Sequence, residues 1–209
     1  MRFDLQIMAS WIEPGTKVLE LGSGGGELLQ YLKEEKQVNE TGIELDESKV
    51  AECIEKGISV LQGDMNEEIL DYPDDCFDYV ILSQTLQQVY EPLELIREMM
   101  RTGKKGVVSF PNFCHWRIRA QIQFSGHAPV TKELPYEWYN TPNIRVLSIR
   151  DFRHFTRDAG YRIIREAAIN PGHEESTGKI VKFIPNLFAT YGIFLIEENG
   201  SKAQDPYKG

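Results

Sequence analysis

A cluster of glycines between a strand pattern and a helix pattern constrains the fold of this chain more than any other feature. Residues 17–21 (Lys-Val-Leu-Glu-Leu) are typical of a buried strand, and residues 27–33 have helical spacing. Gly22, Gly24 and Gly26 fall in the turn between them. Because glycine has no Cβ, a ligand can approach the backbone of such a turn, whose N–H groups are exposed at the start of the helix. The pattern predicts a strand–turn–helix unit that binds a ligand.

Strand and helix patterns alternate along most of the chain. The predicted strands are residues 17–21, 40–45, 58–62, 77–83, 105–110, 161–168 and 188–197. The predicted helices are residues 3–12, 27–33, 47–56, 92–100 and 148–158. Ser148 and Asp151 have the spacing that starts a capping box. Strands and helices alternating in this way are typical of a doubly wound α/β fold, whose ligands bind beyond the carboxyl ends of the strands. We expect a mostly parallel, seven-stranded sheet.

The alternation stops after Pro111 and resumes near residue 148. The intervening segment is rich in prolines and aromatic residues and has no clean period. Because it is short and its flanks continue the alternation, we expect residues 112–147 to be an inserted cap and residues 1–209 to form a single domain.

Composition narrows the class of protein. The chain has 209 residues, of which 41% are hydrophobic and 26% charged, so it can form a substantial core. Its net charge of −9 disfavours binding to nucleic acid or to an anionic membrane. The three cysteines are far apart in sequence, which argues against a disulfide framework or a zinc site. We expect no metal, no signal peptide and no membrane span, and therefore a cytoplasmic protein.

The spacing of the glycines and a nearby acid distinguish two classes of ligand. A dinucleotide-binding turn has the spacing G-x-G-x-x-G, with a pyrophosphate over the start of the helix. Here Glu27 stands at the third position of that motif, and the spacing is G-x-G-x-G. Glu20, near the end of the first strand, suits a ligand with an ammonium group and no phosphate. These residues favour S-adenosylmethionine over NAD, although the glycines alone could form only a tight turn.

Further polar residues follow the second, third and fourth predicted strands. Glu44 is placed to accept hydrogen bonds from both ribose hydroxyls, a feature that both cofactor classes share. Asp64 is placed to accept from an adenine amino group, with Met65 packed on the ring. The alternatives are a solvated strand end for Glu44 and a helix cap for Asp64. Ser83 and Gln84 would line the methionine end of the pocket.

Four motifs within residues 17–110 together resemble those of class I S-adenosylmethionine-dependent methyltransferases. They are residues 18–26 (VLELGSGGG), 42–46 (GIELD), 62–64 (QGD) and 77–83 (FDYVILS). Ser23 departs slightly from that family, in which cysteine or alanine is more usual. The resemblance implies a Rossmann-like fold that binds S-adenosylmethionine or S-adenosylhomocysteine. The binding residues it implies are Glu20, Gly22, Ser23, Gly24, Gly26, Glu44, Leu45, Asp64, Met65, Ser83 and Gln84.

Additional motifs resemble the family of the methionine biosynthesis protein MetW, over about residues 17–155. They are residues 81–87 (ILSQTLQ), 109–113 (SFPNF), 115–117 (HWR) and 134–143 (LPYEWYNTPN). This resemblance implies a role in the methionine pathway and an association with homoserine O-acetyltransferase. It does not identify a methyl acceptor.

Four residues of the inserted segment are candidates for contact with an acceptor or a partner. They are His115, Tyr136, Trp138 and Tyr139. Their alternatives are a structural histidine and aromatics of the core or of a partner surface. Arg117 and Arg119 could form a local basic patch for an acidic partner.

Three functional hypotheses remain, and no residue pattern decides whether the protein is an enzyme. The first is a methyltransferase acting on an unidentified small molecule, since methyl transfer requires mainly alignment and sometimes a base. The second is a non-catalytic subunit that binds the adenosyl cofactor and supports or regulates homoserine O-acetyltransferase. The weakest is an NAD-dependent oxidoreductase.

Overall fold

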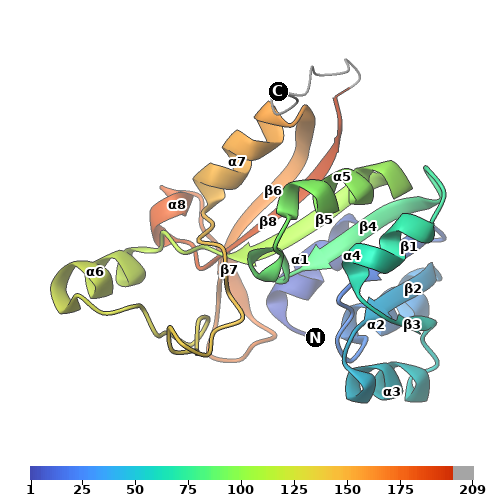
Figure 1. Ribbon diagram of the computed structural model, residues 1–209, viewed down its shortest axis with the longest axis horizontal. Helices are drawn as coiled ribbons and strands as arrows, with labels where there is room; N and C mark the ends of the chain where they lie inside the picture. Colours follow the sequence, from blue (N-terminus) through green and yellow to red (C-terminus); the bar gives the residue numbers. More distant parts are fainter. Residues whose placement is uncertain (200–209) are drawn as a thin grey trace.

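The computed structural model describes residues 1–199, which form one mixed sheet with helices on both faces (Figure 1). The strands are β1 (Lys17–Leu21), β2 (Asn39–Glu44), β3 (Val60–Gln62), β4 (Phe77–Ser83), β5 (Gly103–Pro111), β6 (Tyr161–Pro171), β7 (Gly178–Ile180) and β8 (Tyr191–Glu198). The helices are α1 (Phe3–Trp11), α2 (Glu27–Lys36), α3 (Glu47–Glu55), α4 (Met65–Glu68), α5 (Pro92–Thr102), α6 (Trp116–Ser125), α7 (Ile149–Asp158) and α8 (Pro185–Phe188). Two short 3₁₀ turns are η1 (Ile69–Asp71) and η2 (Leu86–Gln88).

The strand order is β3-β2-β1-β4-β5-β8-β6-β7. Strands β1 to β5 pair in parallel, whereas β8 runs antiparallel between β5 and β6. The predicted doubly wound, mostly parallel α/β fold is therefore confirmed. The described residues hold eight strands, one more than the seven predicted. The additional strand is β7, whose three residues pair with the end of β6 and are too few to show a sequence period.

The central strands are buried on both faces, which explains apolar runs such as residues 79–82 of β4. Leu19 and Leu21 of β1 belong to the core under α5 and α7, whereas Val18 belongs to the core under α1 and α2. Three aromatic rings pack together at the α7 side: Phe110, Phe152 and Phe194 have centroid separations of 4.7 to 5.7 Å. Because β1 pairs in parallel with both β2 and β4, the carboxyl ends of these three strands lie at one edge of the sheet.

Segment 112–147 contains a helix that the sequence pattern did not predict. Helix α6 projects away from the sheet in Figure 1, and Ile118 is its only residue that is fully buried. Ile122 and Phe124 are exposed, so the helix has no apolar stripe to detect. Gly126, with φ of 70°, ends it in a left-handed conformation and was the available signal. That the segment acts as a cap stays a prediction.

The capping box predicted at the start of α7 is present. The Asp151 backbone N–H donates to Ser148 Oγ at 3.2 Å, and the Ser148 backbone N–H donates to the Asp151 carboxylate at 3.2 Å. Ser148 is buried, so no water replaces these bonds readily. This arrangement positions α7 against the aromatic core.

We predict that Ser148→Ala lowers the free energy of unfolding by about 1 kcal/mol, because it removes the cap of α7. Urea unfolding followed by circular dichroism measures the change. Ser125→Ala is the control, since the Ser125 hydroxyl is exposed and donates to a carbonyl within α6. Equal losses in the two variants would contradict a stabilising role for the cap.

Candidate cofactor site and adjoining cavity

The turn between β1 and α2 requires glycine at three positions. Gly22, Gly24 and Gly26 have φ values of 70°, 54° and 72°, in the left-handed region that favours glycine. A Cβ on Gly22 would lie 3.3 Å from Thr85 Oγ1, and one on Gly26 would lie 2.9 Å from Cys53 Sγ. The turn is therefore shaped both by its backbone conformation and by close approach of neighbouring elements.

Glu44 lies at the end of β2, where the sequence predicted it, and contacts the glycine turn. The Gly24 N–H donates to Glu44 Oε2 at 2.7 Å, and the Asp46 N–H donates to Oε1 at 3.0 Å. Each carboxylate oxygen can accept a second hydrogen bond, so two acceptor positions remain. The side chain is thus held in place at the sheet edge and is still able to accept from a diol.

Glu20 is the most unusual titratable group of the site. Its side chain is only 3% exposed, and Oε2 has no hydrogen-bond partner among residues 1–199. Burial raises the pKa of Glu20 to about 8, an effect that the charge of Arg2 partly offsets and that of Glu44 reinforces. A buried polar atom without a partner is costly and rare, so this carboxyl is a candidate ligand-binding group.

Ser23 is placed differently from the other residues of the turn. It is buried, and its hydroxyl packs over β2, 2.7 Å from where a Cβ on Gly42 would lie. Its side chain is therefore part of the core, and only its backbone is available to a ligand.

The residues after β2 and β3 border the same edge. Asp64 caps α4 by accepting from the Asn66 N–H at 2.8 Å, which is the alternative role that the sequence offered. Met65 packs partly against the core, and Leu45 is 69% exposed at the rim. One Asp64 oxygen, Oδ2, makes no hydrogen bond within residues 1–199, so its contact with an adenine stays a prediction.

Gln84 joins the end of β4 to the start of α1, a contact that the sequence pattern missed. The Gln84 Nε2 group donates to Asp4 Oδ2 at 2.5 Å, and Arg2 Nη2 lies 3.3 Å from the same oxygen. Asp4 is buried, and Ser83 Oγ is buried without a partner in the described chain. Arg2 and Asp4 carry no sequence signal, because only the packing of α1 brings them here.

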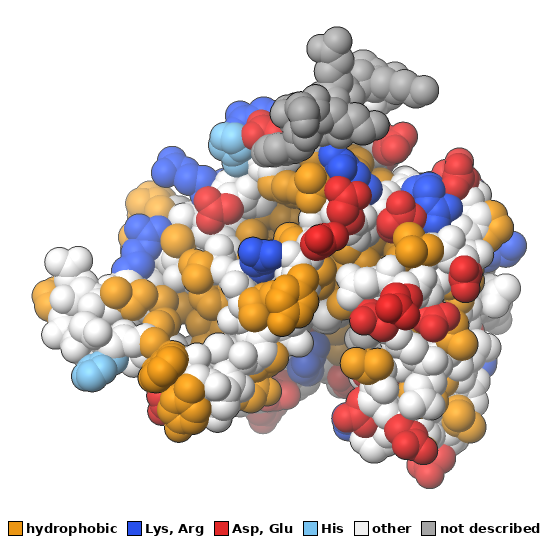
Figure 2. Space-filling model, viewed as in Figure 1, with side chains coloured by type: hydrophobic (Ala, Val, Ile, Leu, Met, Phe, Trp, Pro, Cys, Tyr) orange, Lys and Arg blue, Asp and Glu red, His pale blue; other side chains and the backbone are white. Residues whose placement is uncertain are grey.

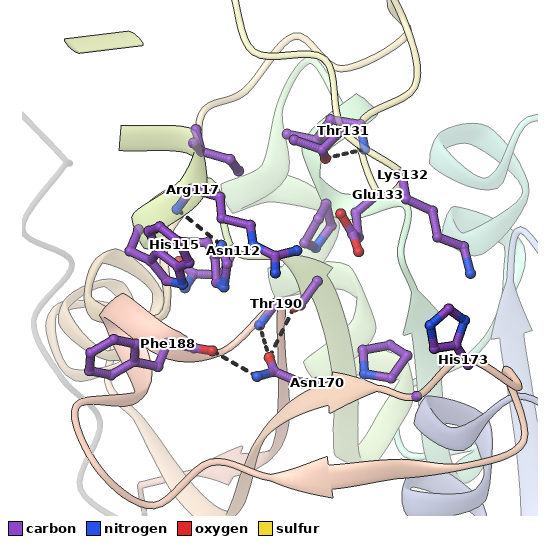
Figure 3. Close-up of a pocket in the computed structure, with 16 residues that line it drawn as sticks. Asn112, His115, Arg117, Thr131, Lys132, Glu133, Asn170, His173, Phe188 and Thr190 are labelled. Atoms are coloured by element: carbon purple, nitrogen blue, oxygen red, sulfur yellow. Dashed lines mark hydrogen bonds between the residues drawn. The ribbon is translucent and has the colours of Figure 1, made fainter. Parts of the chain in front are cut away.

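A cavity of about 750 Å³ opens next to this region (Figure 3). It lies between α6, residues 131–134, the end of β6 and the residues preceding β8. Its polar lining residues are Asn112, His115, Arg117, Thr131, Lys132, Glu133, Asn170, His173 and Thr190.

Of the four acceptor or partner candidates, His115 alone lines this cavity. Its Nδ1 accepts from the Arg117 backbone N–H at 3.3 Å and caps α6. Burial, followed by the charge of Arg117, lowers the pKa of His115. Its Nδ1 therefore has a structural role as the cap of α6, which matches the alternative that the sequence offered for this residue.

The three aromatic candidates lie elsewhere on segment 112–147. Tyr136, Trp138 and Tyr139 are 45%, 76% and 69% exposed, and the last two rings meet edge to face at 5.7 Å. Figure 2 shows hydrophobic side chains exposed over the irregular chain between α6 and α7. These residues therefore belong to the surface, not to the core or the cavity.

A second cavity, of about 180 Å³, lies between the large cavity and the Gln84 region. Arg2, Asp4 and Gln84 line it on one side. Lys132, Glu133, Pro171 and Gly172 line both cavities. The large cavity therefore adjoins a smaller one that reaches Gln84, the residue after β4.

The described residues contain no group of acidic, histidine or cysteine side chains placed to hold a metal. Cys53, Cys76 and Cys114 are free. None of the helices within residues 1–199 has the length and apolar character needed to cross a membrane.

Comparison with solved structures identifies the class of fold. An S-adenosylmethionine-dependent methyltransferase from Archaeoglobus fulgidus superimposes with a TM-score of 0.68 at 15% identity, covering 93% of this chain and 91% of that one. A possible histamine N-methyltransferase from Thermotoga maritima gives 0.65 at 18% identity, over 94% and 87%. TrmK of M. capricolum, solved with S-adenosylhomocysteine, gives 0.60 at 12% identity, over 95% and 69%. The fold is that of the S-adenosylmethionine-dependent methyltransferases.

Sequence relationships identify the family. A model of the methionine biosynthesis protein MetW matches residues 2–196, and the chain belongs to that family. The bifunctional methionine biosynthesis protein MetXA/MetW of Rhodopirellula baltica is 33% identical over 162 residues, 73% of this chain, which span only 26% of that relative. The demethylmenaquinone methyltransferase of Listeria welshimeri is 25% identical over 175 residues, 74% of this chain and 73% of the relative.

We predict that the stability of the ligand-free protein falls between pH 5 and 8 because of Glu20. In this range the unfolded chain ionises Glu20, whereas the raised pKa keeps the folded carboxyl protonated. One proton contributes a slope of about −1.4 kcal/mol per pH unit. Urea unfolding at several pH values should show a flatter decline for Glu20→Gln.

Glu34→Gln, which removes an exposed carboxyl from α2, controls for the loss of one acidic side chain. If Glu20→Gln followed the same pH dependence as the unmodified protein, the folded carboxyl would not be held protonated.

Proposed function

We propose that this protein binds S-adenosylmethionine at the glycine turn and is a methyltransferase of methionine biosynthesis that acts on a small molecule. The observation that carries the proposal is the buried Glu20 carboxyl, whose Oε2 lacks a partner among residues 1–199. An ammonium group of the ligand would supply that partner and would favour the ionised form of the carboxyl. A phosphate in the same position would instead oppose ionisation of the carboxyl.

The surrounding residues fit the remaining parts of such a cofactor. Glu44 retains acceptor positions for the ribose hydroxyls, and Arg2 is a candidate for the cofactor carboxylate because its charge acts on Glu20. Leu45 and Met65 offer apolar surface for the adenine, and Asp64 Oδ2 an acceptor for its amino group.

The bound cofactor would supply an electrophilic methyl group on a sulfonium. This chain would hold and orient the cofactor. The backbone at Gly22, Gly24 and Gly26 would contact it, and Ser83 and Gln84 would line its methionine end. His115 uses Nδ1 to accept from the Arg117 backbone N–H, so that nitrogen is not free to take a proton from an acceptor. Alignment of the reactants would therefore provide most of the rate enhancement.

A second candidate function is favoured by the Rhodopirellula baltica relative, whose name joins MetXA and MetW in one bifunctional protein. Fusion places two activities at a high effective concentration, which suits proteins that work together. In this candidate function the chain is a subunit that binds the adenosyl cofactor and supports or regulates homoserine O-acetyltransferase.

We predict that the protein binds S-adenosylhomocysteine in a calorimetric titration and that NADH produces no heat of binding. Glu44→Gln should weaken binding of the adenosyl ligand about tenfold, because it removes one of the two carboxylate acceptors at the ribose. Glu44→Ala removes both acceptors and should weaken binding further. Glu47→Gln, three residues away in the first turn of α3, should bind normally. Binding of NADH without S-adenosylhomocysteine would overturn the cofactor assignment.

We also predict transfer of a labelled methyl group from S-adenosylmethionine to a metabolite in a cell extract. A side chain at Gly24, whose φ is 54°, would strain the turn, so Gly24→Val should abolish the transfer. Absence of any transfer, with co-purification of homoserine O-acetyltransferase that persists in Glu44→Ala, would reject the methyltransferase in favour of the subunit.

A further inference from the structure

We propose that the 750 Å³ cavity binds a small molecule that carries an α-amino acid group, with its carboxylate at Arg117 and its ammonium at Glu133. This inference rests on the proposed function in one respect: the ligand would be the methyl acceptor. The binding site itself depends only on the residues that line the cavity.

The floor of the cavity is a rigid polar surface whose hydrogen bonds are already made. Asn170 donates to the Phe188 carbonyl at 2.9 Å and accepts from the N–H and hydroxyl of Thr190 at 2.8 and 2.9 Å (Figure 3). Asn112 donates to the Asn186 and Ala189 carbonyls at 3.1 and 2.8 Å. Because these side-chain amides already form hydrogen bonds within the protein, a ligand must gain most of its binding energy from other groups of the cavity.

Arg117 and Glu133 are the charged groups that remain. Figure 3 shows the Arg117 side chain, from α6, and the Glu133 side chain, from the following loop, both directed into the cavity. Neither forms an ion pair with another residue of the range 1–199, and the guanidinium lies 5.5 Å from the Trp116 ring centroid. Lys132, by contrast, lies 3.7 Å from Glu175.

A cation and an anion in one cavity, not paired with each other, fit a zwitterion. The planar guanidinium can donate two parallel hydrogen bonds to a carboxylate, and Glu133 can accept from an ammonium group. A phosphate would meet repulsion from Glu133, and a simple amine would meet repulsion from Arg117. The pair of charges therefore selects an amino acid over a phosphate or a simple amine.

The place and size of the cavity fit an acceptor. The smaller cavity shares Glu133 with the large one and reaches Gln84, which lies at the proposed methionine end of the cofactor site. A volume of about 750 Å³ is within the usual range for metabolite pockets of about 300–1,000 Å³ and exceeds what a small amino acid fills. The side chain of the ligand would therefore extend toward Gln84.

The test is a thermal-shift screen of the full chain with the twenty proteinogenic L-amino acids, with and without S-adenosylhomocysteine, followed by calorimetry of those that stabilise it. Each binder is compared with the amine that lacks its carboxylate and the acid that lacks its amino group. For phenylalanine these are phenethylamine and 3-phenylpropanoic acid. Both analogues should bind at least tenfold more weakly.

Arg117→Gln and Glu133→Gln should each reduce amino acid affinity at least tenfold and leave S-adenosylhomocysteine binding unchanged. Arg119→Gln and Glu137→Gln are matched controls, because these residues do not line the cavity and Arg119 Nε donates to the Cys114 carbonyl at 2.7 Å. Normal melting curves for the four variants establish that they fold.

The proposal is overturned if S-adenosylhomocysteine binds and none of the twenty amino acids does. It is also overturned if the acid without the amino group binds as tightly as its parent, since the site would then recognise only an anion. If amino acids bind through Arg117 and Glu133 but S-adenosylhomocysteine does not bind, the cofactor assignment fails and the amino acid site stands.

Discussion

The hydrogen bonds across the glycine turn connect the two strands on which the candidate site depends. Gly22 and Ser23 donate their backbone N–H groups to the Ile43 carbonyl at 2.8 and 3.1 Å, and Gly24 donates to the Glu44 carboxylate. The end of β1, the start of α2 and the end of β2 are thereby held in one arrangement. The parallel pairing of β1 with β2 sets Glu20 opposite Gly42 and so brings it within electrostatic reach of Glu44.

The burial of Glu20 and its proximity to Glu44 make ionisation of Glu20 unfavourable in the ligand-free protein. Burial and the charge of Glu44 both raise the pKa of Glu20, and the positive charge of Arg2 offsets only part of this. Such a carboxyl lowers the stability of the ligand-free protein above pH 5, and a cationic ligand would stabilise its ionised form. Buried carboxyls with strongly shifted pKa values concentrate at functional sites for this reason.

The cavity beside α6 is formed by residues from several separate parts of the chain. It has its hydrogen-bonded floor at Asn112, Asn170 and Thr190, which are the residue after β5, a residue of β6 and the residue before β8. These strands adjoin one another because β8 runs antiparallel between β5 and β6. Residues from separate parts of the chain therefore meet at one edge and leave Arg117 and Glu133 facing the space between them.

Much of the fold could be predicted because its signals are local. The apolar run of β1, the conformational requirement of the glycines and the Ser148–Asp151 capping box each act within a few residues. Helix α6 and strand β7 escaped prediction, since α6 buries only one residue fully and β7 has only three residues. Their positions depend on long-range contacts that no period reveals.

The sequence by itself determined the doubly wound fold, the family and the positions of Glu20 and Glu44 at the ends of their strands, because strand and turn chemistry follow from neighbouring residues. Only the tertiary structure decided that Glu20 is buried without a partner for Oε2 in the described chain and that Asp4 contacts Gln84. It also decided that Tyr136, Trp138 and Tyr139 lie outside the cavity. Burial, and therefore the energy of a charge, depends on which distant segments pack around it.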